Sequence, residues 1–130
     1  MVKEIINVPP SKFHYSQGIK TEAFIFVAGT VGNENPDTGE DVHGIEAQTH
    51  QCLQNIRRSL ESAGSSLADV VYTTVYIPNR DDFPKMNEVY KGYFPKAPPT
   101  RATIVAGLVS PEMLVEIQCI AQRANGAGPS

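Results

Sequence analysis

Two short apolar segments near the C-terminus, each carrying one charged residue, constrain the fold of this chain most. They run from about Arg101 to Leu108 and from Leu114 to Ala121, within PPTRATIVAGLVSPEMLVEIQCIA. Their content of β-branched residues predicts strands. A charge on so apolar a strand is costly to bury unless it is paired or used. Because Arg101 and Glu116 have opposite signs and their strands are expected to be neighbours, we predict that they form a small polar pocket.

The rest of the chain divides by the period of its apolar residues. Period-2 or continuous apolar runs predict strands, a period of 3.6 predicts helices, and clustered turn formers predict loops. We expect strands near 3–8, 22–29 and 70–77, a short extended piece at 14–18, a loop at 33–40, and helices at about 45–63 and 82–94.

Both predicted helices have one apolar stripe and a recognisable end. Gly64 is suited to the position just after the first helix, and Asp81 or Asp82 can cap the start of the second. The first stripe comprises Ile45, Thr49, Cys52, Leu53, Ile56, Leu60 and Ala63, and the second comprises Phe83, Met86, Tyr90 and Phe94.

The order strands, helix, strand, helix, strands predicts an α+β domain whose two helices cover only one face of the sheet. In the strand at 22–29, Phe24, Phe26 and Ala28 alternate with Ile25 and Val27, so both faces of this strand are apolar. An uncovered apolar sheet face usually marks an interface. We therefore expect a homo-oligomer whose subunits pack sheet against sheet or close into a barrel-like core.

Composition narrows the possible partners and compartments. The net charge of −3 and the scattered lysines and arginines argue against nucleic acid or an anionic membrane as a partner. The N-terminus lacks the apolar stretch of a signal peptide. Cys52 and Cys119 are expected to be buried free thiols, which fits a reducing, cytoplasmic location, and no ligand spacing predicts a metal site.

A series of short motifs in order resembles the RidA/YjgF family of reactive intermediate deaminases over almost the whole chain. Each motif is weak alone, but the ordered set, with Arg101 and Glu116 at the family's spacing, is specific. The matching pieces are Tyr15-Ser16-Gln17-Gly18, Phe26-Val27-Ala28-Gly29, Thr38-Gly39-Glu40, Ala63-Gly64, Leu67 to Tyr76, Met86-Asn87-Glu88-Val89-Tyr90, Phe94, Pro99-Thr100-Arg101-Ala102, Val115-Glu116-Ile117 and Ile120-Ala121.

The resemblance implies a chorismate-mutase-like fold: a mixed six-stranded sheet with two helices on one face, over residues 1–124, before a flexible tail at 125–130. It implies a homotrimer with active sites between subunits. The implied activity is cofactor-free hydrolysis of reactive 2-imino or enamine acids, such as 2-iminopropanoate and 2-iminobutanoate, to 2-oxo acids and ammonia. Some relatives act instead on 2-aminomuconate or aminoacrylate.

The resemblance also assigns site residues. Arg101 suits bidentate recognition of a substrate carboxylate, or else it is a structural partner of Glu116. Glu116 is expected to activate water, to protonate the departing nitrogen, or only to orient Arg101. The remaining candidates are Tyr15 and Ser16 at the cleft entrance, Asn87 on the second helix, Thr103 on the same side as Arg101, where many relatives have cysteine, and Gly29 as a pocket wall that needs close approach or an unusual φ.

Three rival functions remain open. The first is a binding module, in which the same cleft holds a 2-oxo acid without turnover. Relatives described as translation inhibitors with ribonuclease activity suggest an RNA-directed role, which the acidic charge disfavours. A chaperone-like role would use the apolar surface and would not depend on Arg101.

Overall fold

The computed structural model describes residues 3–123, so the tail predicted at 125–130 lies outside the described residues. Strands and helices alternate in the predicted order, with one further short strand at Gly18–Lys20. The strands are β1 (Glu4–Ile6), β2 (Gly18–Lys20), β3 (Phe24–Val31), β4 (Val70–Ile77), β5 (Thr100–Val105) and β6 (Glu116–Gln122), and the helices are α1 (Ile45–Ser62) and α2 (Phe83–Tyr93).

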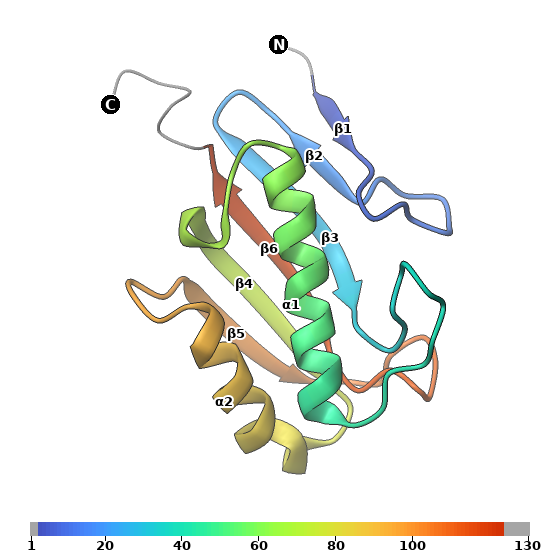
Figure 1. The fold of residues 1–130 in the computed structure, drawn as a ribbon. Helices are drawn as coiled ribbons and strands as arrows, with labels where there is room; N and C mark the ends of the chain where they lie inside the picture. Colours follow the sequence, from blue (N-terminus) through green and yellow to red (C-terminus); the bar gives the residue numbers. More distant parts are fainter. Residues whose placement is uncertain (1–2, 124–130) are drawn as a thin grey trace.

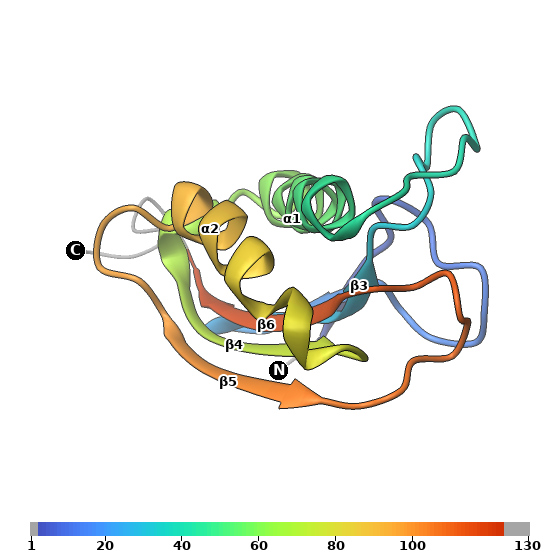
Figure 2. The ribbon, with the colours of Figure 1, turned by 90° about the horizontal axis from the view of Figure 1, so that it is seen from below.

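The six strands form one mixed sheet in the order β1-β2-β3-β6-β4-β5. Neighbouring strands are antiparallel except β4 and β5, which are parallel and are joined by the crossover that contains α2. Figures 1 and 2 show both helices on one face of this sheet, which confirms the predicted α+β architecture. Within residues 3–123, neither helix is both long and apolar enough to cross a membrane.

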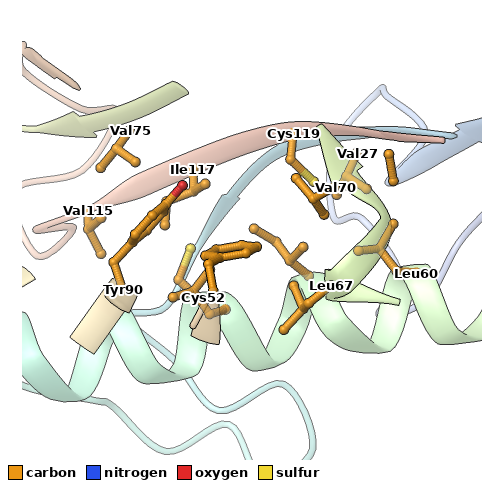
Figure 3. Close-up of a cluster of buried hydrophobic side chains, with 14 of the residues drawn as sticks. Val27, Cys52, Leu60, Leu67, Val70, Val75, Tyr90, Val115, Ile117 and Cys119 are labelled. Atoms are coloured by element: carbon orange, nitrogen blue, oxygen red, sulfur yellow. The ribbon is translucent and has the colours of Figure 1, made fainter. Parts of the chain in front are cut away.

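Helix α1 packs its predicted stripe into the core between the helices and the sheet. All seven stripe residues are buried, and Figure 3 shows Cys52 and Leu60 among the side chains of β4 and β6. The helix ends at Ser62 and is followed by Gly64, whose φ of +80° suits glycine. The N–H groups of Gly64 and Ser65 donate to the carbonyls of Glu61 and Leu60, respectively. These two bonds are the Schellman arrangement that satisfies the last carbonyls of a helix.

Helix α2 differs from the prediction at its start. Neither Asp81 nor Asp82 caps the helix through its side chain, because a 3₁₀ turn at Arg80–Asp82 precedes it. The Asn79 side chain accepts from the N–H of Asp81 and caps that turn instead. Of the predicted stripe, Met86, Tyr90 and Phe94 are buried, whereas Phe83 is 37% exposed beside Arg101.

The face of the sheet opposite the helices is apolar, as predicted, and we call it the open face. Strand pairing aligns one row of side chains across it from β1 to β4, because residues that are paired across neighbouring strands point to the same side. Phe26 and Tyr72 in this row are 43% and 42% exposed. The row comprises Ile5, Ile19, Phe26, Ile120 and Tyr72. Its exposure is what an interface between subunits requires.

Candidate active site

Arg101 lies on β5 and is held on the helix side of the sheet by α2. It pairs with Thr73 of β4, whose fully buried side chain points toward the helices. Its Nη1 donates to Oδ1 of Asn87 (2.8 Å), and its guanidinium carbon stands 4.7 Å from the Tyr90 ring centroid and 5.6 Å from that of Phe83. Positions 83, 87 and 90 share one face of a helix, so α2 supplies the whole cradle.

The cradle holds the guanidinium without neutralising it. The partners of Arg101 are an amide oxygen and two aromatic faces, and none of the ion pairs among the described residues includes Arg101. Burial raises the pKa of Tyr90, whose hydroxyl also shares a 2.8 Å hydrogen bond with Thr73. Cation–π contacts orient an arginine while leaving most of its five N–H donors available. The arrangement can therefore bind an incoming carboxylate.

Glu116 begins β6 and points to the open face. It pairs with Val31 and Tyr76, and the next residue, Ile117, is fully buried on the helix side. Gly29 makes room for it, since a Cβ at position 29 would come within 2.2 Å of a Glu116 carboxylate oxygen. The prediction of close approach at Gly29 is thus confirmed, and no unusual φ is needed there.

Glu116 is one of the residues that line an open pocket of about 450 Å³. Beside Glu116, the pocket has apolar walls and two further polar side chains, those of Tyr76 and Gln118. The Tyr76 hydroxyl donates a hydrogen bond to the Gln118 side chain (3.3 Å). The alternation of Glu116 and Gln118 with buried residues was the available sequence signal for Gln118, which our prediction missed. The lining residues are Tyr76, Ala106, Gly107, Leu108, Val109, Glu116 and Gln118.

Burial raises the pKa of the Glu116 carboxyl. The sequence left open whether burial, which raises this pKa, or a nearby Arg101, which would lower it, has the larger effect. In a single chain, the effect of burial is the larger one. Strand β4 separates β5 from β6, so the expectation that the two charged strands are neighbours was wrong. Because Arg101 faces the helices and Glu116 faces the open side, one chain does not bring these two side chains into one pocket.

The other predicted site residues divide between the two sides of the sheet. Thr103 pairs with buried Val75 and so lies on the helix side with Arg101. Tyr15, 48% exposed, and Ser16 lie just before Gln17, which the prediction missed as a positioning group. The Gln17 carbonyl accepts from the N–H of Ala28 (2.8 Å), and its side chain donates to Thr30 (3.0 Å). These bonds place the 15–17 segment beside Gly29, on the strand that accommodates Glu116.

The raised pKa of Glu116 predicts a pH-dependent stability. Between the ordinary glutamate pKa of about 4.3 and the raised value, the folded chain binds more protons than the unfolded chain. Stability therefore falls as pH rises through this window. We expect the Tm of Glu116→Gln to increase relative to that of wild type by about 1–3 °C as the pH is raised from 4 to 7, measured by calorimetry. Exposed Glu22→Gln is the control, and a Tm difference for Glu116→Gln that does not change with pH would contradict the assignment.

Comparisons with known proteins find relatives that match nearly the whole length of this chain. The family described as Endoribonuclease L-PSP matches residues 5–123. A RutC family protein of Pyrococcus horikoshii is 44% identical over 94% of this chain and 99% of its own. The 3-aminoacrylate deaminase RutC of Acinetobacter baylyi is 34% identical over 93% of this chain and 98% of its own. The chloroplastic Reactive Intermediate Deaminase A of Arabidopsis thaliana is 35% identical over 92% of this chain and 65% of its own.

Solved structures agree with these relatives. The YjgF gene product of E. coli has a TM-score of 0.86 at 30% identity, covering 93% of this chain and 99% of its own. E. coli TdcF, solved with bound serine, has a TM-score of 0.84 at 29% identity, covering 95% of this chain and 99% of its own. The chain therefore belongs to the RidA/YjgF family, which includes proteins named as reactive intermediate and aminoacrylate deaminases.

Proposed function

We propose that this protein is a cofactor-free deaminase that hydrolyses reactive 2-imino and enamine acids, such as 2-iminopropanoate and 2-iminobutanoate, to 2-oxo acids and ammonia. The observation that carries the proposal is Arg101, a half-buried guanidinium held by Asn87, Tyr90 and Phe83 with no ion-pair partner among the described residues. All of these substrates carry a carboxylate, which an arginine recognises through paired hydrogen bonds. The deaminase names of two relatives support the same reaction.

We further propose that the working form is a homotrimer and that each active site lies between two subunits. The apolar open face supports association, because exposed Phe24, Phe26 and Tyr72 would be buried by packing sheet against sheet. The opposite orientations of Arg101 and Glu116 support shared sites. In this arrangement, one chain contributes Arg101, Asn87 and Thr103, and its neighbour contributes Glu116 with Gly29, Tyr15 and Ser16.

The proposed reaction uses water as its only co-substrate. Arg101 binds the carboxylate and fixes the position of the neighbouring C=N carbon, and positioning of this kind contributes up to about 7–11 kcal/mol in the best intramolecular cases. The imine reacts in its protonated form, and water attacks the C=N carbon while Glu116 accepts one of the water protons, which gives a neutral amino alcohol. Glu116 returns this proton to the nitrogen, the C–N bond breaks as ammonia leaves, and the hydroxyl proton passes to the Glu116 carboxylate as the C=O of the 2-oxo acid forms. A pKa raised by burial suits such a two-way proton carrier.

The location and the preferred substrate are part of the proposal. Both cysteines, Cys52 and Cys119, are buried and unpaired, which fits a reducing compartment such as the cytoplasm. The walls formed by Leu108, Val109 and Ala106 favour a small apolar side chain on the imine. Aminoacrylate and 2-aminomuconate are the alternative substrates.

The test is release of ammonia and 2-oxo acid from 2-iminobutanoate, which a threonine dehydratase generates in situ. We expect wild type to accelerate release severalfold over the spontaneous reaction, with aminoacrylate and 2-aminomuconate assayed in parallel. Acceleration of none of the three would overturn the deaminase proposal. Slow release combined with binding of a 2-oxo acid would favour a binding module, and cleavage of RNA by the same preparation would favour ribonuclease activity.

A further inference from the structure

The wall of the Glu116 pocket is built largely by the segment 106–115, which connects β5 to β6 and which we call the wall loop. Four of the pocket's seven lining residues belong to it, namely Ala106, Gly107, Leu108 and Val109. Much of this loop is solvent-exposed, and Val109 keeps 92% of its surface accessible, whereas Val115 at the end of the loop is fully buried. An exposed loop defines a pocket only if its ends are held firmly.

At the end of the wall loop nearest Glu116, Leu114 and Val115 pack against the core, and the hydrogen bonds to α1 come from one side chain, that of Gln48. Gln48 is 2% exposed. Its Nε2 donates to the Glu112 carbonyl (2.9 Å) and to the Val42 carbonyl (3.0 Å). Its Oε1 accepts from the Leu114 N–H (2.9 Å). The buried amide group of Gln48 therefore both donates a hydrogen bond to the wall loop and accepts one from it. The accepted bond comes from Leu114, two residues before Glu116.

The opposite end of the loop is attached to the sheet, where the Ala106 N–H donates to the Ile77 carbonyl (3.1 Å). Between the two attachments the described backbone bonds are local, with the Met113 N–H donating to the Ser110 carbonyl (3.1 Å). Releasing Gln48 would therefore leave the loop between Leu108 and Met113 without hydrogen bonds to α1, while the Ala106 attachment and the core packing of Leu114 stay in place.

The backbone that carries Gln48 is itself fixed against the sheet. A Cβ at Gly32 would stand 2.0 Å from the Gln48 carbonyl oxygen and 2.6 Å from the Cys52 nitrogen, so the end of β3 touches the helix backbone directly. Close packing of this kind transmits position without slack. Through the hydrogen bonds of Gln48, the position of the wall loop is therefore fixed relative to β3. This is the same strand that carries Gly29, which lies against Glu116.

We infer that Gln48 is a positioning residue that fixes the wall loop and so sets both the placement of Glu116 and the size of substrate side chain that the pocket accepts. This inference rests on the proposed function. Gln48 touches no substrate and acts through Glu112 and Leu114. Displacement of a reacting group by about 1 Å can cost about 100-fold in rate, so a role of this kind is visible in kinetics.

The test compares Gln48→Met, which keeps the side chain's length but removes its hydrogen bonds, with Ser59→Ala. Ser59 is buried on the same helix, and its hydroxyl bonds the Val8 carbonyl, far along the chain from the wall loop. We expect Gln48→Met to lower kcat/KM for 2-iminobutanoate by about 10- to 100-fold and to change the rate ratio between 2-iminopropanoate and the imine of leucine. Ser59→Ala should stay within about twofold for both substrates.

Amide hydrogen exchange, followed by mass spectrometry, supplies a readout that does not depend on turnover. In Gln48→Met, exchange over 108–114 should accelerate while exchange over 50–62 of α1 stays as in wild type. Faster loop exchange with an unchanged kcat/KM and side-chain ratio would overturn the inference, and so would unchanged loop exchange. Wild type that turns over none of the imines would instead overturn the proposed function, and the exchange result would still decide whether Gln48 holds the loop. If Gln48→Met does not fold, Gln48→Glu, which keeps the acceptor for Leu114, replaces it.

Discussion

Replacing Arg101 by methionine should lower kcat/KM for 2-iminobutanoate by about 10³-fold, which corresponds to about 4 kcal/mol of transition-state binding. The reason is the loss of paired, charge-assisted hydrogen bonds to the substrate carboxylate. Methionine preserves the packing against Tyr90 and Phe83, so the folded chain should remain intact. Initial rates of 2-oxo acid release, with particle mass checked by light scattering, measure the effect.

Two companion variants make this result specific. Arg101→Lys keeps the charge but lacks the planar fork, and it should recover only part of the activity. Arg58→Met removes a partly buried arginine that pairs with Asp37 on the surface, and it should leave the rate unchanged. Equal activity of wild type and Arg101→Met would show that Arg101 is structural and would remove the observation on which the proposed function rests.

Phe26→Asp should convert the proposed trimer into folded monomers and abolish turnover. Phe26 lies in the middle of the apolar row on the open face, where an aspartate in a buried subunit interface would be unpaired. We expect the association constant to fall by about 10³-fold or more. Analytical ultracentrifugation measures the mass, and circular dichroism checks that the monomer is folded.

Ala47→Asp is the matched control for this charge change. Ala47 is exposed on α1, on the helix side of the molecule, so the same charge there should leave both mass and activity as in wild type. A Phe26→Asp protein that keeps the wild-type mass would contradict burial of the open face. A folded monomer with full activity would contradict sites shared between subunits.

The helices and the central strands could be predicted because their periods are long and uninterrupted. Seven positions of the α1 stripe agree with a 3.6-residue repeat, and β4 occupies the bounds predicted for it. Strand β2 was missed as a strand because three residues, one of them Gly18, are too few to establish a period. Asp82 stands at the N-cap position of α2 but makes no capping hydrogen bond through its side chain, and the side chain that caps here is that of Asn79, at the preceding 3₁₀ turn.

The charged residues of the site could be selected from the sequence, but their relation could not. Chain order places β5 directly before β6, whereas the parallel crossover through α2 moves β5 to the sheet edge beyond β4. The sequence also left ambiguous which residues of β5 face the helices. Ala102 and Ile104 are the alternating apolar residues of this strand, which would normally face the core, yet they lie on the open face. An apolar outer face removes the contrast from which strand orientation is normally read.

The most direct test of the account mixes two inactive variants, Arg101→Ala and Glu116→Ala, by joint refolding in equal amounts. If each site takes Arg101 from one chain and Glu116 from the next around a closed ring, about a quarter of the sites in random mixtures hold both intact residues. We therefore predict recovery of about a quarter of the wild-type rate of imine hydrolysis. Mixed oligomers that remain as inactive as either parent would contradict an active site built by two chains.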